Sequence, residues 1–339
     1  MSKMHNRRVE KKSTKALDQS GAMVVIMVAA LVGLCGFMAL AVDVGHMVVV
    51  KAELQRTTDA AVLAGVAGLV PYTTEGTYQT PNWVQAQTKA HTMIAEEANK
   101  ADDLKFTDTE GTVDYGYWLL KPPSGYVQLP LPKAKPTTPA YLPMPALIVT
   151  LSRNVTMYLA PVIGISSPQK ISATATAILP EGYSIVKNTF TMAVRKDIVF
   201  NPDQTVNIIP QDFGWGDNGQ WFNLDGSNDV PTIRRNDQIN GQQQIYIAPG
   251  AKATLYDSSI IGQTIIVPVV DPGPTSPPPG VPTKTWQTII GFAAFKVTGL
   301  GNKSIDGHFV TDYHSPDAIP GEGKGTYLGV SGTPRLVSP

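Results

Sequence analysis

The sequence predicts an α+β protein in which a single N-terminal transmembrane helix extends into a long stalk helix, followed by a helix-plus-sheet part and a β-rich C-terminal part. Three features support this prediction: residues 21–42 form an uncharged apolar run, residues 43–70 contain no proline, and strand-like alternation recurs between residues 113 and 299. The 339 residues include 30 Gly and 28 Pro, a combined share above the usual ~12%, which favours a loop-rich β body.

Charge is balanced over the whole chain but not along it. Lys and Arg together number 27, and so do Asp and Glu. A neutral chain argues against a nucleic-acid binder, because such domains usually carry a basic excess that neutralises phosphates. Residues 1–20 hold six basic side chains against two acidic ones, so a basic head precedes a net acidic remainder.

The uncharged run has the length of a membrane span. Its 22 residues would form a helix of ~33 Å, and a bilayer core is ~30 Å thick. A cleaved signal peptide usually has a shorter apolar core of roughly 7–15 residues, and a buried core helix rarely stays uncharged for so long. By the positive-inside bias, we expect the basic head in the cytoplasm and the residues after the span on the other side of the membrane.

Small residues mark one face of this span. Ala29, Gly33 and Gly36 recur at i, i+4 and i+7, where another transmembrane helix, including that of a second copy of this chain, could approach closely. Small residues are common in such helices in any case, so both interpretations stay open. Cys35 is the single cysteine, which excludes an internal disulfide, and a thiol in hydrocarbon is expected to be an apolar filler.

Residues 43–70 predict a continuation of the helix. Val50, Leu54, Ala61 and Gly65 recur near helical spacing and give a narrow face of small and apolar residues. Such a face suits close packing of the helix on another helix or on a sheet. A continuous helix over residues 21–70 would be ~75 Å long, so the part beyond the bilayer would project as a stalk or lie along a sheet.

The first part of the chain resembles the TadE/TadG-like family of Flp (Tad) pilus assembly proteins, and in particular their TadG-like N-terminal domain. The order and spacing of several short pieces agree between residues 21 and 70. The matching positions are Gly21, Asp43, Gly45, Leu54, Gln55, Asp59, Ala60 and Ala61. Later stretches such as ALIVTLSRNV and ISATATA resemble the periplasmic part of such proteins more loosely.

The resemblance implies a single-pass protein of the bacterial inner membrane whose periplasmic body helps build a pilus through protein contacts. The implied partners are other pilus assembly proteins or pilins, and no nucleic acid. Together with charge, hydropathy and strand patterns, the resemblance predicts a cytoplasmic basic head at 1–20, a transmembrane helix at 21–42, a TadG-like helical stalk with a small sheet at 43–180, and a β-rich periplasmic domain at 181–339.

An alternative role is a minor pilin or adhesin-like subunit carried on the filament. Type IV-like pilins are cut after a glycine and usually carry Glu as the fifth residue of the mature chain. Ile26 is the fifth residue after Gly21, so the sequence favours an anchored component over a processed pilin.

Helix and strand patterns divide the body. Thr80 and Pro81 predict the start of a second helix that reaches Ala98. Strands are predicted at residues 113–119, 147–152, 171–177, 264–270 and 288–299. The long helix and the first three strands would form a pilin-like arrangement, with Leu147, Val149 and Leu151 on one face of the second strand.

Turn signals separate these segments. Asn240-Gly241 predicts a hairpin between residues 232–239 and 244–247. Residues 122–145 hold eight prolines, a density that no regular helix or central strand is expected to tolerate. A second proline-rich run, residues 271–282, predicts an extended loop or a presented polyproline segment.

Catalytic chemistry is not indicated, and the sequence predicts a protein that is not an enzyme and holds no cofactor. HExxH, GxSxG and GxxxxGK[ST] motifs are absent from the sequence. Asp306, His308, Asp312 and His314 would share one face of a single strand. The two histidines would then lie ~20 Å apart, too far for one metal ion unless the chain bends.

The segment at residues 212–229 is rich in Asp and Gly but fits neither a DxSxS motif nor a calcium-loop pattern, so turns are expected there. It carries four large aromatic residues, Phe213, Trp215, Trp221 and Phe222. They would serve either as core anchors or as an adhesive, sugar-binding surface.

Overall fold

The structure is a computed structural model. It describes residues 13–70, 73–75, 78–107, 109–137, 141–180, 184–185, 189–199, 205–208, 219–227, 239–241, 243–247, 257–271, 286–301, 304–319 and 327–337. Most of the predicted basic head therefore lies outside the described residues, as do Phe213, Trp215 and nearly all of the second proline-rich run.

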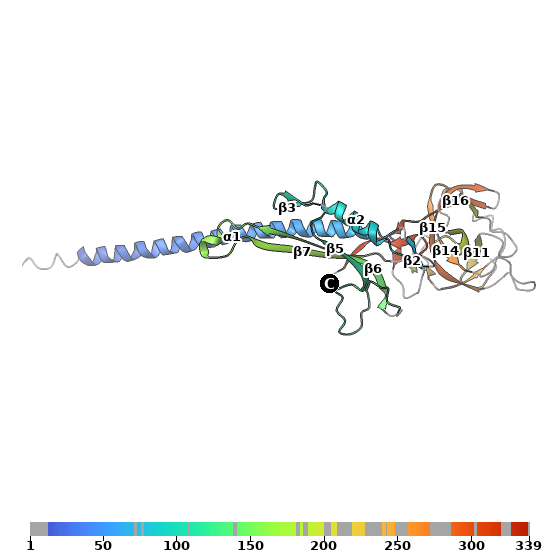
Figure 1. Cartoon of the computed structure of the whole chain (residues 1–339), viewed down its shortest axis with the longest axis horizontal. Coiled ribbons are helices and arrows are strands. Elements are labelled where there is room, and N and C mark those ends of the chain that lie inside the picture. Colours follow the sequence, from blue (N-terminus) through green and yellow to red (C-terminus); the bar gives the residue numbers. More distant parts are fainter. Residues whose placement is uncertain are drawn as a thin grey trace, which may run out of the picture.

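One unbroken helix dominates the molecule. Helix α1 runs from Ser13 to Ala67, and its 55 residues correspond to about 82 Å. Figure 1 shows that its N-terminal half stands clear of the body, whereas its C-terminal half lies along a sheet. The predicted continuation of the helix beyond the apolar run is confirmed as far as Ala67, and so is the α+β class with a long N-terminal helix and a β-rich body.

A four-stranded antiparallel sheet packs against the C-terminal half of α1. Its order is β20 (Arg335–Val337), β7 (Gln169–Ile178), β6 (Pro143–Val155) and β5 (Thr112–Leu119). Leu147, Val149 and Leu151 of β6 are buried in one core with α1, whereas Ile148 faces a second cluster on the other side of the sheet. The predicted alternation along β6 is therefore confirmed.

Helix α2 (Trp83–Ile94) covers the last turns of α1. Its N-cap is Asn82, whose side chain accepts the N–H of Gln85 at 3.1 Å, and not the predicted Thr80. The predicted extension to Ala98 is also wrong. The helix ends at Ile94, where the chain turns: the Met93 carbonyl accepts the N–H of Glu96 at 3.3 Å and the side-chain amide of Asn99 at 2.6 Å.

The proline-dense stretch ends inside a strand. Strand β6 begins at Pro143 and includes Pro145, although a central strand was not expected there. A proline at the first position of a strand loses no ladder bond. Pro145 still accepts the N–H of Leu179 at 2.8 Å, and Tyr117 opposite it donates to Pro132 instead.

The distal part of the body is a ring of paired strands. Strand β14 (Thr264–Val270) pairs with β9 (Met192–Arg195) and with β15 (Trp286–Gly301), and β11 (Gly219–Asn223) and β13 (Gln244–Ile247) complete the ring. Strands β16 (Ser304–Val310) and β10 (Val206–Ile208) extend it beyond β15. The strands predicted at residues 264–270 and 288–299 are confirmed.

The remaining elements are short. They are β1 (Thr73–Glu75), β2 (Tyr78–Thr80), β3 (Lys100–Ala101), β4 (Leu104–Lys105), η2 (Ala160–Ile163), β8 (Ser184–Ile185), α3 (Lys196–Val199), β12 (Ile239–Asn240), η4 (Ser258–Ile260), β17 (Tyr313–Ser315), β18 (Ala318–Ile319) and β19 (Val330–Gly332).

The hairpin predicted around Asn240-Gly241 is wrong. A turn does form, with the N–H of Gln243 donating to Asn240 at 3.1 Å, but β12 pairs with β8 while β13 pairs with β11 and β15. The ring buries Ile245 and Ile247 of β13, which local turn chemistry does not anticipate.

The end of the chain returns to the first sheet. Strand β20 pairs with β7, and Gly332 donates to the carbonyl of Pro180 at 2.6 Å. Tyr327 is buried in the same core as α1 and β6. The described C-terminal residues thus close the sheet that supports the helix.

A glycine sets the distance between α1 and α2. A Cβ atom on Gly65 would lie 2.8 Å from Leu147 Cδ2 and 2.9 Å from Ala90 Cβ. Gly65→Val should therefore lower the free energy of unfolding by about 1–3 kcal/mol, as over-packing does.

Gly45→Val on the exposed side of the same helix is the matched control. No atom lies within 4 Å of its Cβ position, and a surface change of this kind should stay within about 0.5 kcal/mol. Thermal unfolding followed by circular dichroism measures both variants. Equal midpoints for the two would contradict tight packing at Gly65.

Candidate functional site: the Asp43 junction

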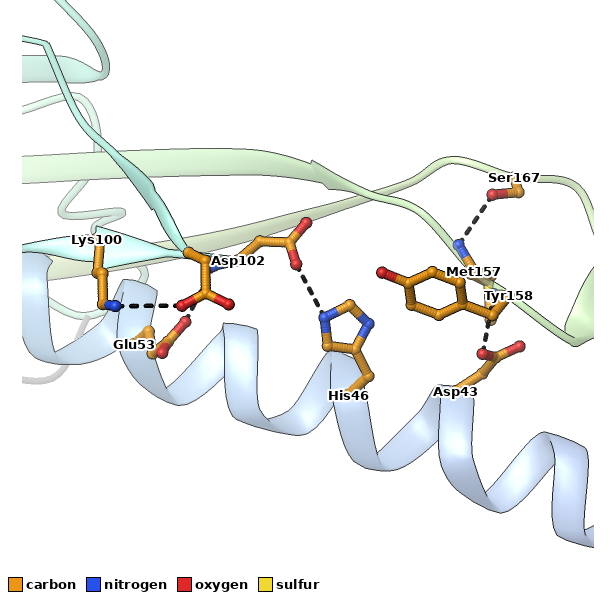
Figure 2. A network of polar contacts seen from close by, with 9 residues as sticks. Asp43, His46, Glu53, Lys100, Asp102, Met157, Tyr158 and Ser167 are labelled. Carbon is orange, nitrogen blue, oxygen red and sulfur yellow. Dashed lines mark hydrogen bonds and ion pairs between the residues drawn. The ribbon is translucent and has the colours of Figure 1, made fainter.

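A buried carboxylate stands at the end of the uncharged run on α1. Asp43 directly follows Val42, and its residue is only 1% exposed. Its Oδ1 accepts the N–H of Tyr158 at 3.0 Å, and its Oδ2 accepts the N–H groups of Leu159 at 2.9 Å and Ala160 at 2.5 Å. Figure 2 shows the carboxylate directed from α1 toward this segment.

The three N–H groups belong to the loop between β6 and β7. Tyr158 and Leu159 lead into the short helical turn η2, which begins at Ala160, and the first N–H groups of a helical turn have no acceptor within the turn itself. Asp43 supplies that acceptor from an element more than a hundred residues earlier in the chain. The carboxylate thus caps η2 and fastens the loop to α1.

Hydrogen bonding keeps Asp43 ionised despite its burial. Burial alone would raise the pKa of the carboxyl group, but the N–H donors of Ala160, Leu159 and Tyr158, together with nearby His46, outweigh it and lower the pKa below 3.8. A lowered folded-state pKa stabilises the fold above the unfolded-state pKa of about 4, and this contribution is lost as the pH falls through the folded-state value. The contribution is therefore present in full at neutral pH.

The turn between β3 and β4 also contacts α1, about one helical turn beyond Asp43. It places Asp102 Oδ1 2.9 Å from His46 Nε2, and the N–H of Asp102 donates to Glu53 at 3.1 Å. The His46 ring also lies 5.8 Å from the ring of Tyr158, centroid to centroid. We define the Asp43 junction as Asp43, His46, Glu53, Asp102 and residues 158–160 (Figure 2).

The other family-motif positions serve the helix and its packing. Leu54 and Ala61 are fully buried against the sheet, and Gln55 donates to Asp59 at 2.8 Å along the helix. Ala60 is half-buried beside them, whereas Gly21 and Gly45 are exposed. Only Asp43 among the motif positions bonds to the β6–β7 loop.

The small residues of the apolar run lie apart from the body. Ala29 and Gly33 are exposed on α1, and Gly36 is half-buried because the β6–β7 loop lies beside it. Packing of this face on another transmembrane helix stays a prediction.

The other residues considered as possible metal ligands have structural roles. The chain turns after Val310, so His308 lies on β16 and His314 on β17, where its Nδ1 is 2.8 Å from Ser331 Oγ. Within the described ranges no group of three His, Cys, Asp or Glu side chains is placed to hold a metal ion. The predicted turn is present at Asp225, which accepts the N–H of Ser227 at 2.9 Å.

Two of the four aromatic residues predicted as core or adhesive can be placed. Trp221 and Phe222 are fully buried on opposite faces of the distal sheet. They are core anchors, and an adhesive surface made of these two side chains is excluded.

Sequence reasoning missed most of the junction. It named Asp43 only as a family-motif position and gave no role to His46, Asp102 or the loop at residues 158–160. Two signals were present: Asp43 is the first charge after the uncharged run, and residues 156–168 form another uncharged stretch, TMYLAPVIGISSP.

The structure up to this point defines a class of protein. Among the described residues, one helix is long and apolar enough to cross a membrane, which fits a single-pass anchor, and its C-terminal half packs against a sheet. Family comparison matches residues 21–68 to Flp pilus-assembly TadE/G-like proteins and residues 72–177 to Tad-like Flp pilus-assembly proteins.

These two segments therefore have the sequence of Flp (Tad) pilus-assembly proteins, residues 21–68 of the TadE/G-like family and residues 72–177 of the Tad-like family. They contain the apolar run, the whole Asp43 junction, α2, and the sheet up to the last residues of β7. Comparison with curated proteins and with solved structures gave no match.

Asp43→Ala should release the β6–β7 loop from α1. Three backbone N–H groups lose their acceptor, so hydrogen–deuterium exchange at residues 158–160 should accelerate several-fold or more. Asp103→Ala is the control, because the Asp103 side chain is 96% exposed and its ion pair, with Lys100 at 3.1 Å, lies away from the β6–β7 loop. Unchanged exchange in Asp43→Ala would contradict the capping role.

Proposed function

We propose that this chain is a structural, non-enzymatic component of Flp (Tad) pilus assembly, held in the bacterial inner membrane by residues 21–42. Its basic head lies in the cytoplasm and its body in the periplasm. The body meets pilins or other assembly proteins. A flexible tether would suffice for an enzyme that only needs to be near the membrane, whereas this chain connects its anchor and body by a single helix.

The observation that carries this proposal is the continuity of α1 across Asp43. The helix passes from the uncharged run into the core without a break, and the junction fastens two tips of the body within about ten residues of Val42. Such a connection fixes the height and direction of the body above the bilayer. Fixed geometry is what a component that receives or positions other subunits requires.

An apolar surface beyond the bilayer supports protein contacts. Val44, Val48 and Val49 are 42%, 61% and 56% exposed on the side of α1 that faces away from the sheet. Gly45 lies among them and has open space at its Cβ position. A second helix could therefore approach closely here.

The alternative is a minor pilin or adhesin-like subunit carried on the filament, because the same helix and sheet could pack into a polymer. Fractionation of cells before and after shearing separates the two roles. We expect the protein to stay with an inner-membrane marker. Recovery of most of it with sheared filaments would contradict the anchored role.

Orientation is tested by a fusion. An alkaline phosphatase reporter placed after Pro339 should be active, because that enzyme needs the periplasm, and a fusion at Gln19 should be inactive. Activity in the opposite pattern would overturn the orientation. The two fusions are matched in all but their position relative to residues 21–42.

A further inference from the structure

The β6–β7 loop, residues 156–168, exposes an apolar surface next to the apolar run. It contains no charged residue. Val162 and Tyr158 are 84% and 68% exposed, and Leu159 and Ile165 are each 38% exposed. An exposed, contiguous apolar surface of this kind marks a contact with another apolar body.

The loop and α1 together enclose a groove. It has a volume of about 680 Å³ and is lined by α1 from Leu31 to Val42 and by Leu159 and Val162 of the loop. The lining therefore lies on the head side of Asp43, within the uncharged run. From Leu31 to Val42 the helix rises ~16 Å, which is about half of a ~30 Å bilayer core and so the depth of one leaflet.

We propose that this loop dips into the periplasmic leaflet of the membrane and that the groove holds one acyl chain of a phospholipid. The proposal rests on the proposed function, in which residues 21–42 span the bilayer. Depth follows from the junction: Tyr158 lies level with Asp43 and His46, the first polar residues after the span. Tyr158 thus takes the interfacial position that Tyr favours, with Val162 deeper.

Irregular backbone enters hydrocarbon only when its polar groups are satisfied within the protein. The loop meets this condition at the following N–H groups. Asp43 accepts three N–H groups, and Ser167 Oγ accepts that of Met157 at 3.0 Å. Val162, Gly164 and Ile165 donate to carbonyls within the loop, and Pro161 has no N–H. A carboxylate at Asp43 is needed because the start of η2 would otherwise present bare donors to lipid.

A phospholipid chain fits this groove better than a second protein helix. Its walls are almost wholly aliphatic and run lengthwise along α1 for the depth of one leaflet, which is the shape of a chain. A second helix would need about 10 Å of width between α1 and the loop, yet Asp43 holds the loop directly against α1.

The test places a fluorophore on the loop in a lipid bilayer. Single cysteines replace Val162, Met27 or Val127 in a full-length Cys35→Ala chain, carry an NBD label, and are reconstituted in vesicles of phosphatidylethanolamine and phosphatidylglycerol. A doxyl group on the acyl chain of added lipid quenches only by contact. Met27 reports the span, and Val127 is an equally exposed valine in the loop at the opposite end of the sheet.

We expect quenching at Val162 close to that at Met27 and several-fold stronger than at Val127. If Met27 is quenched but Val162 behaves like Val127, the loop stays in water and the lipid contact is wrong while the anchor stands. Blue-shifted emission at Val162 without quenching would mean that protein covers the loop, which also overturns the proposal. Absence of quenching at Met27 would overturn the membrane anchor itself.

Discussion

The bonds from the Asp43 carboxylate to the N–H groups of residues 158–160 are the interaction on which the rest of the structure depends. Without them the β6–β7 loop would no longer be fastened to helix α1, and the body would be held by the contacts of His46 and Glu53 with Asp102 and by packing from Val50 onward. The carboxylate belongs to the first residue after the uncharged run, and it binds the β6–β7 loop. The body is therefore attached to α1 directly where the uncharged run ends.

Small residues make the rest of the assembly possible. Gly65 admits α2 and Leu147, and the alanines of β7 at positions 173, 175 and 177 let the sheet approach α1 closely. The buried contacts of a helix this long must be spread along its length, because a helix held at a single point could swing relative to the body. The junction holds one end of the packed half, α2 holds the other, and β20 closes the edge of the sheet beside β7.

Residue spacing along the sequence correctly predicted the long helix and the strands β5, β6 and β7 of the first sheet. The uncharged run, the proline-free continuation and the alternation along β6 gave the helix and the first sheet, since helical and strand spacing are properties of neighbouring residues. Asp43 was named by family resemblance, but its acceptor role was not found because its partners lie more than a hundred residues away. The same limit explains the false hairpin at Asn240 and the unforeseen return of β20. Strand partners depend on the burial of side chains in a whole core, such as Ile245 of β13 and Tyr327 shortly before β20.

Rigidity across Asp43 is the central claim, and a distance between two spin labels tests it most directly. Met27 and Ala52 are both exposed on α1, and 25 helical residues place them ~38 Å apart on nearly the same side. With nitroxide labels at these two positions in a Cys35→Ala chain reconstituted in lipid, a pulsed electron–electron double resonance measurement should give one narrow distribution near that distance. A broad distribution, or one shifted to clearly shorter distances, would show a hinge between the apolar run and the body and would contradict the continuous, fastened helix.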